Sequence, residues 1–205
     1  MKRLIPLAIS ASALLFLAGC SGGGNDRDAS ESTTVLPISS TPEVAVSVGP
    51  APTQRNDSGR PLVSFDPCVA VGDDLIVKAG FDPESRERSD MTFDTYSFIG
   101  CKFADKEMVN GQKLTIRTLL VTSSNITLDE FRDRYRGTST EVTVGGHPAL
   151  RYDDPRIHGE ACNIAIASND GVLDLSKGTR SAFTDEARCA GIQDIAETIS
   201  SALPK

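Results

Sequence analysis

The five cysteines constrain the fold of this chain more than any other feature. Four of them, Cys68, Cys101, Cys162 and Cys189, lie in the C-terminal two thirds of the 205-residue sequence. A zinc site would need C-x₂₋₄-C pairs, whereas neighbouring cysteines here lie about 30 residues apart or more. In an oxidising compartment, an even number of cysteines so spaced predicts disulfides. The sequence around the fifth cysteine, Cys20, indicates that compartment.

The N-terminal segment has the features of a secretion signal. A positively charged start, Met1-Lys2-Arg3, precedes an apolar run from Leu4 to Ala18, about 15 residues long. A transmembrane helix needs about 20 apolar residues. We therefore interpret residues 1–19 as a signal peptide.

The signal ends in Leu17-Ala18-Gly19-Cys20, which resembles a bacterial lipobox. In that motif a diacylglycerol is attached to the cysteine thiol, and the chain is cut before the cysteine. The alternative is an ordinary signal peptide with a cysteine near its cleavage site. We expect Cys20 to be lipidated and to hold the protein at the outer face of the cytoplasmic membrane, in the cell envelope.

Residues 20–60 are expected to form a flexible spacer. Half of residues 21–60 are Ser, Gly, Pro or Thr, and none is aromatic. Such a segment cannot bury enough apolar area to offset its ordering entropy. An edge strand at residues 43–48, which alternate between apolar and polar, is the alternative.

Residues 61–205 suit one extracytoplasmic domain. Four cysteines allow three disulfide connectivities, and we favour Cys68–Cys101 and Cys162–Cys189, because each pair joins neighbouring elements at one end of the domain. Each loop would contribute about 3–4 kcal/mol on chain-entropy grounds.

The charge of the chain argues against a nucleic-acid partner. The full sequence has a net charge of −7, and removal of Lys2 and Arg3 with the signal leaves 19 basic and 28 acidic residues. Nucleic acids and anionic lipid surfaces attract basic proteins. We therefore expect neither nucleic acid nor an anionic lipid surface as a partner.

Turn and cap signals divide the domain into hairpins and helices. Hairpin turns are indicated at Asn110-Gly111, Gly145-Gly146 and Asn169-Asp170-Gly171. Strands are expected at residues 95–103, 112–124, 139–144, 147–153, 161–168 and 172–177. Helices are expected at residues 65–81, after the capping box of Thr127 and Glu130, and at 184–204, with a solvated loop at 84–90. The pattern predicts an α+β fold, with an antiparallel sheet of hairpins, two disulfides, and an N-terminal and a long C-terminal helix packed on one face.

Five stretches together resemble a family of actinobacterial, mycobacterial-type envelope lipoproteins whose four-cysteine domain has no known function. They are "FDPC", "GCKF", "VGGHPALRYD", "CNIAIASNDGVLDL" and "RCAGIQDIAETISSALP", within residues 65–204. The family often has Trp two residues after its second cysteine, where this chain has Phe103. The resemblance implies an envelope lipoprotein and supplies no catalytic residues.

Catalytic motifs are missing from residues 61–205, which contain no G-x-S-x-G, H-E-x-x-H or P-loop sequence. The two histidines, His147 and His158, could form a triad on paper with Asp153 or Asp154, but no serine is marked as a nucleophile. Asp153, Asp154, His158 and Glu160 are weak candidates for a metal site. A solvated loop is the simpler interpretation, and we expect no cofactor.

The sequence therefore favours a non-enzymatic, lipid-anchored module that binds an envelope protein or a small ligand. An envelope hydrolase without a recognisable active-site motif is the first alternative. A structural accessory subunit of an envelope complex is the second.

Overall fold

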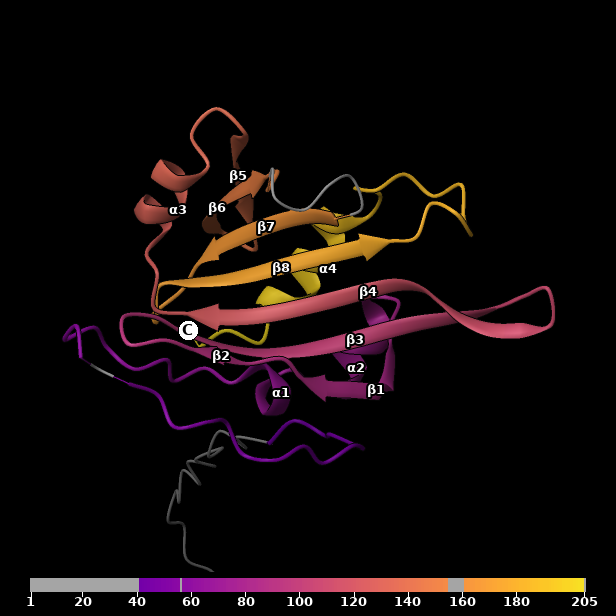
Figure 1. Cartoon of the computed structure of the whole chain (residues 1–205), viewed down its shortest axis with the longest axis horizontal. Helices are drawn as coiled ribbons and strands as arrows, with labels where there is room; N and C mark the ends of the chain where they lie inside the picture. Colours follow the sequence, from indigo (N-terminus) through magenta and orange to yellow (C-terminus); the bar gives the residue numbers. More distant parts are fainter. Residues whose placement is uncertain (1–40, 56, 155–160, 205) are drawn as a thin grey trace, which may run out of the picture. The chain divides into compact units, whose positions relative to one another are not determined.

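The computed structural model describes residues 41–55, 57–154 and 161–204, and an antiparallel sheet dominates these residues (Figure 1). The strands are β1 (Asp82–Arg88), β2 (Met91–Thr92), β3 (Ser97–Val109), β4 (Gln112–Ser124), β5 (Ser139–Val144), β6 (His147–Tyr152), β7 (Ala161–Ala167) and β8 (Val172–Thr179). The helices are α1 (Pro67–Ala70), α2 (Asp73–Lys78), α3 (Leu128–Arg134) and α4 (Ile192–Ser200). None of these helices has the length and hydropathy to cross a membrane.

The three predicted hairpins are present as β3–β4, β5–β6 and β7–β8. At the first turn, Asn110 and Gly111 have φ values of 50° and 81°, the left-handed conformation that two-residue hairpin turns require. Pairing of β4 with β8 joins the hairpins into one sheet, in the order β1-β3-β4-β8-β7-β6-β5, with β2 also paired to β3. The predicted antiparallel sheet is therefore confirmed.

The terminal helices pack on one face of the sheet, and α3 packs on the other. Because side chains of a strand alternate between faces, Leu119 and Val121 of β4 join the main core under α1, α2 and α4. A smaller core that includes Phe131 and Tyr152 lies under α3, on the opposite face. The predicted helix packing is confirmed only in part, because it did not include a helix on that second face.

The lengths predicted for the two terminal helices are wrong. Residues 65–81 form two short helices, because the backbone is extended at Val71 and Gly72. Residues 184–204 are helical only within α4, which starts after Gly191 in a left-handed conformation, with φ 68°. The apolar pattern of the sequence cannot distinguish one long helix from a short helix and a turn that pack against the same core.

The charged residues 84–90, predicted as a solvated loop, form most of β1 and its connection to β2. Arg86 is only 4% exposed. Its guanidinium donates hydrogen bonds to the Cys68 carbonyl (3.0 Å) and the Asp73 carboxylate (2.6 Å), and lies 5.0 Å from the ring centroid of Phe103. Polar contacts, and not an alternating apolar face, attach β1 to the rest of the domain. The sequence pattern therefore does not indicate a strand here.

Two disulfides fasten helical segments to the sheet. Cys68–Cys101 joins α1 to β3, and Cys162–Cys189 joins β7 to the segment before α4. These are the pairs that the sequence analysis favours. Both bridges lie on the face that the terminal helices cover, since their sulfurs belong to the main core.

Part of the predicted spacer contacts the domain. The Asp73 backbone N–H donates a hydrogen bond of 2.9 Å to the Glu43 carbonyl, and the Asp73 carboxylate accepts one of 2.6 Å from the Ala45 N–H. Residues 43–48 form no strand. Cys20 and the spacer up to residue 40 lie outside the described residues, so the lipid anchor stays a prediction.

Asp170, in the turn between β7 and β8, fastens the segment that leads into α1. Its carboxylate accepts hydrogen bonds from the backbone N–H groups of Ser64 (3.0 Å) and Phe65 (2.7 Å). It also accepts from the hydroxyls of Ser64 (2.7 Å) and Ser123 (3.2 Å). The first helical segment and the last hairpin are thereby joined through one side chain.

Substitution Asp170→Ala should destabilise the domain by about 2 kcal/mol, because hydrogen bonds to a charged group are lost and their donors left without that partner. Urea unfolding, followed by circular dichroism, would measure the change. Asp185→Ala is the matched control, because Asp185 is exposed. Equal stability of the two variants would contradict the anchoring role of Asp170.

Candidate functional site

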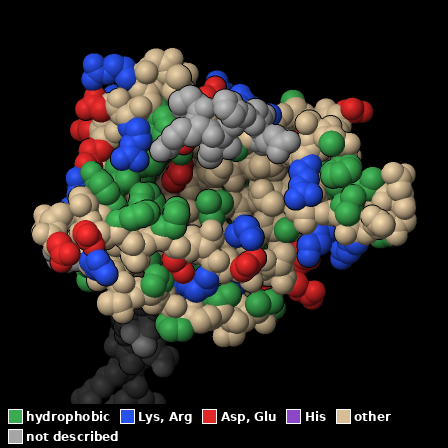
Figure 2. Space-filling model, viewed as in Figure 1, with side chains coloured by type: hydrophobic (Ala, Val, Ile, Leu, Met, Phe, Trp, Pro, Cys, Tyr) green, Lys and Arg blue, Asp and Glu red, His purple; other side chains and the backbone are tan. Residues whose placement is uncertain are grey.

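The sheet face that carries α3 is hollowed where α3 does not cover it. One hollow of about 410 Å³ lies beside α3, and a second of about 360 Å³ continues along the sheet. Leu120 of β4 and Ser176 of β8 line both hollows. In Figure 2, hydrophobic side chains gather on the same side of the view as α3, next to a hollowed region. We call the hollow beside α3 the aromatic hollow, because of the side chains described next.

Aromatic side chains form the wall of this hollow. The chain contains three Tyr, eight Phe and no Trp, and all three tyrosines line the hollow together with three phenylalanines. The lining aromatic residues are Phe93, Tyr96, Phe98, Phe131, Tyr135 and Tyr152. They come from the β2–β3 segment, α3 and β6, so only the folded sheet brings them together.

The rings contact one another in pairs. Tyr135 stacks on Tyr152 with centroids 4.1 Å apart, and Phe131 meets Tyr152 edge to face at 5.6 Å. Across the hollow, Phe93 meets Phe98 edge to face at 6.0 Å. Phe93 is 53% exposed. The wall is therefore packed at its base and open to solvent at its rim.

An arginine packs over one of the aromatic rings that line the hollow. The Arg60 guanidinium lies 4.6 Å from the Tyr96 ring centroid and donates hydrogen bonds to both Glu130 carboxylate oxygens, at 3.0 and 2.5 Å. These bonds lower the pKa of Glu130 to about 2. Glu130 also completes the predicted capping box with Thr127, which is confirmed at the start of α3. Arg60 thus connects α3 to the β2–β3 segment.

Asp174 of β8 lies on the floor of the hollow. Both of its carboxylate oxygens lie 2.9 Å from the Tyr152 hydroxyl, which donates to them. Burial is the main cause that raises the pKa of Asp174 to about 7; the Tyr152 hydrogen bond opposes this rise, and the Asp154 charge adds to it. Burial, and then the Asp174 charge, raise the pKa of Tyr152 well above its ordinary value, so this phenol stays a donor.

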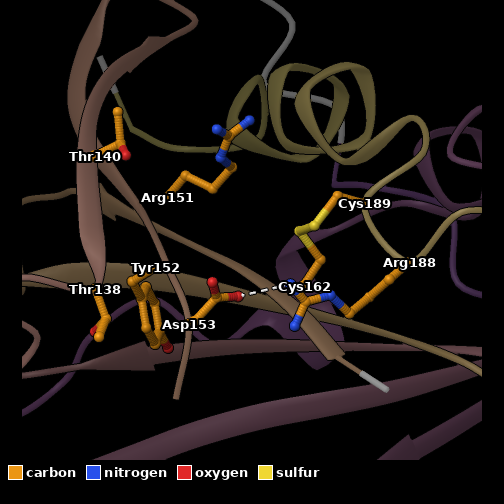
Figure 3. Close-up of a pocket in the computed structure, with 8 residues that line it drawn as sticks. All are labelled: Thr138, Thr140, Arg151, Tyr152, Asp153, Cys162, Arg188 and Cys189. Carbon is orange, nitrogen blue, oxygen red and sulfur yellow. Dashed lines mark ion pairs between the residues drawn. A yellow bond between two sulfur atoms is a disulfide. The ribbon is translucent and has the colours of Figure 1, made fainter. Parts of the chain in front are cut away.

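A different hollow of about 280 Å³ lies on the other face of β6, beside the Cys162–Cys189 disulfide (Figure 3). Arg188 forms an ion pair of 3.0 Å with Asp153 there. Thr138, Thr140, Arg151 and Tyr152 also line it. Two guanidinium groups and two hydroxyls would suit a small anion, but Asp153 offsets the charge of one of them. This hollow is therefore the weaker candidate for a ligand site.

The structure separates the candidate metal ligands Asp153 and Asp154. Asp153 lines the hollow beside the disulfide, whereas Asp154 lines the aromatic hollow and accepts a hydrogen bond of 3.2 Å from Tyr135. His158 and Glu160 lie outside the described residues. Within the described ranges, no group of three or more His, Cys, Asp or Glu side chains could hold a metal ion.

The described residues do not form the possible catalytic triad of His147 and Asp153. His147 begins β6 and Asp153 directly follows its end, which places them about 20 Å apart at the rise of an extended strand. His147 instead lines a small hollow with Leu203 and Pro204. The other candidate histidine, His158, is not among the residues described.

Asp174 is the residue that the sequence analysis missed. Its position in the strand "VLDLSK" places it on the same face as Val172 and Ser176, opposite the apolar positions Leu173 and Leu175. That alternation indicates a polar residue facing away from the main core. It does not indicate that aromatic side chains from three other segments surround it.

The stability of the domain should fall as pH rises from about 4 to about 7 because of Asp174. Its folded pKa of about 7 exceeds the unfolded value of about 3.9, so the folded state binds more protons in this window. Asp174→Asn removes this contribution, and thermal unfolding at pH 5 and pH 8 would measure the difference. The melting temperature of the unsubstituted protein should fall more between pH 5 and pH 8 than that of Asp174→Asn, so the difference between the two should change in favour of the variant. Asp185→Asn should show no such change, and an equal response of both variants would contradict the assignment.

Comparison with protein families matches residues 15–201 to the family described as "Protein of unknown function (DUF3558)". No curated protein and no solved structure matched the chain significantly. The matched range covers every strand of the sheet and both hollows on the face that carries α3. It supplies no activity for any of them.

Proposed function

The chain belongs to the DUF3558 family of proteins of unknown function, and we propose that it is a lipid-anchored envelope protein whose domain binds a small organic ligand. We propose further that it is of the actinobacterial, mycobacterial type that the sequence motifs resemble. Binding takes place in the aromatic hollow, and the protein has no catalytic role. Cys20 holds the domain at the outer face of the cytoplasmic membrane.

The aromatic hollow carries this proposal. Its volume of about 410 Å³ is in the range of small-molecule sites, which combine apolar walls with a few polar groups. Here the polar groups include Asp174, Asn163 and Thr122, from three adjacent strands, and Asp154, the second residue after β6. A rigid sheet below and aromatic rings at the side fix the positions of these groups.

The binding role is favoured over hydrolysis by the separation of the candidate catalytic groups. Among the described residues, His147 and Asp153 lie at opposite ends of β6. Asp174 instead accepts a hydrogen bond from a tyrosine hydroxyl, an arrangement that orients a carboxylate without activating a nucleophile.

A second candidate function, an accessory subunit of an envelope complex, is favoured by the β3–β4 hairpin. Pairing of β4 with β8 extends only from Arg117 to Ser124, so the tip of the hairpin projects beyond the neighbouring strand (Figure 1). Met108 near the tip is 67% exposed. A projecting arm with an exposed apolar side chain is suited to contact another protein.

Purification of the full chain in dodecyl maltoside, followed by denaturation and mass spectrometry of the extract, tests the ligand. A small molecule should co-purify with the unsubstituted protein. Ser176→Phe should reduce its amount at least tenfold, because Ser176 lines the hollow and the new ring would fill it. Thr143→Phe, on an exposed position of β5, should leave it unchanged.

Thermal unfolding of Ser176→Phe would show that the variant is folded, and Thr122→Phe on the neighbouring strand is a second test of the same hollow. An extract without any molecule that depends on the open hollow would contradict the proposal.

Substitution Cys20→Ser should remove the lipid and shift the protein out of the tightly bound membrane fraction, because acyl chains supply the anchoring energy. Carbonate extraction and immunoblotting would measure the distribution. Ser21→Ala, which keeps the cysteine, is the control. Continued tight membrane association of the Cys20→Ser variant would contradict the anchor.

A further inference from the structure

Asp174 differs from three other part-buried carboxylates of the described residues. Asp66, Asp73 and Asp90 each form an ion pair with Arg86 or Arg88. No Lys or Arg among the described residues forms an ion pair with Asp174, whose carboxylate accepts its hydrogen bond from a neutral phenol. The aromatic hollow therefore contains a carboxylate whose charge no described side chain neutralises.

The surroundings of Asp174 raise the free energy of its ionised form. Burial favours the protonated acid, and the neighbouring Asp154 adds repulsion. Tyr96, Tyr135 and Tyr152 are the other titratable side chains besides Asp154 that line the hollow, and Arg134 at the end of α3 is the cation that lines it among the described residues. A positive charge placed in the hollow would stabilise the ionised form of Asp174.

Aromatic faces supply the second half of a cation site. The negative face of a Tyr or Phe ring attracts a cation within about 6 Å of its centroid, and quaternary ammonium ligands are bound in this way. Arg60 already lies over Tyr96 at 4.6 Å. Phe93 and Phe98 stand on the open side of the hollow, where a ligand would reach them.

From these contacts we infer that the aromatic hollow binds an organic cation, a quaternary ammonium or protonated amine, with its nitrogen near Asp174 and its alkyl groups against the aromatic wall. This inference rests on the proposed function, since it names the ligand class of the same hollow. The carboxylate neutralises the ligand charge, and the rings replace the water that surrounds its alkyl groups.

Arg134 provides a test of the charge of the ligand, because its own positive charge would repel a cation in the hollow. Removal of this charge should strengthen binding of a cation, whereas removal of the Asp174 charge should weaken it. A purely apolar hollow would respond to neither substitution in this pattern. The two variants thus separate an electrostatic site from a hydrophobic one.

Choline, which carries a trimethylammonium group, and its uncharged isostere 3,3-dimethylbutan-1-ol are the probes for the test. Isothermal titration calorimetry of the full chain in dodecyl maltoside at pH 8 should show that choline binds at least ten times more tightly than 3,3-dimethylbutan-1-ol. Asp174→Asn should reduce choline affinity at least tenfold, and Arg134→Gln should raise it about two- to fivefold. Asp185→Asn, at an exposed site, should change neither.

Two further measurements keep the test independent of folding defects. Phe93→Ala removes a half-exposed ring without opening the core, and it should weaken choline binding about two- to fivefold. Choline affinity of the unsubstituted protein should also fall between pH 8 and pH 5.5, as Asp174 becomes protonated.

Equal affinity for choline and the neutral isostere, or choline binding that Asp174→Asn leaves intact, would overturn the cation site. Absence of choline binding would overturn it as well. A small molecule that still co-purifies and is displaced by Ser176→Phe would then leave the proposed function standing. Failure of both experiments would remove the ligand site altogether.

Discussion

Pairing of β4 with β8 is the interaction on which the rest of the structure depends. It joins the first hairpin, β3–β4, to the last, β7–β8, although β5 and β6 lie between them in the sequence. Thr122 is paired with Asp174 in this register, so the pairing forms the floor of the aromatic hollow. The same register places Leu119 and Val121 in the main core. Core and candidate site are thus set by one strand pair.

Two buried cations attach neighbouring segments to the sheet, a role that apolar side chains have elsewhere in the domain. Lys177 is fully buried, and its ammonium donates hydrogen bonds to Glu186 (2.6 Å) and to the Ala190 carbonyl (2.8 Å). Arg86 has the same role for α1 and α2. Because a buried charge without its partner is costly, each of these pairs specifies the position of a segment that has little regular structure.

Features set by neighbouring residues could be predicted from the sequence, and features set by distant contacts could not. The Asn110-Gly111 turn and the capping box of Thr127 and Glu130 are local, and both are present. β1 depends on Arg86, whose partners lie in other elements. The sequence offers Asp153 and Asp154 as neighbouring ligands of one metal site, yet these consecutive residues after β6 line different hollows.

The described chain begins beside the helices rather than beside the hollow. Thr41 and Pro42 lie next to α2 and the end of α4, on the face of the sheet opposite the aromatic wall. The first described residues therefore lie on the side of the sheet away from the mouth of the aromatic hollow. A ligand that entered the proposed site would not displace these residues, so filling the hollow leaves the packing of this segment against α2 unchanged.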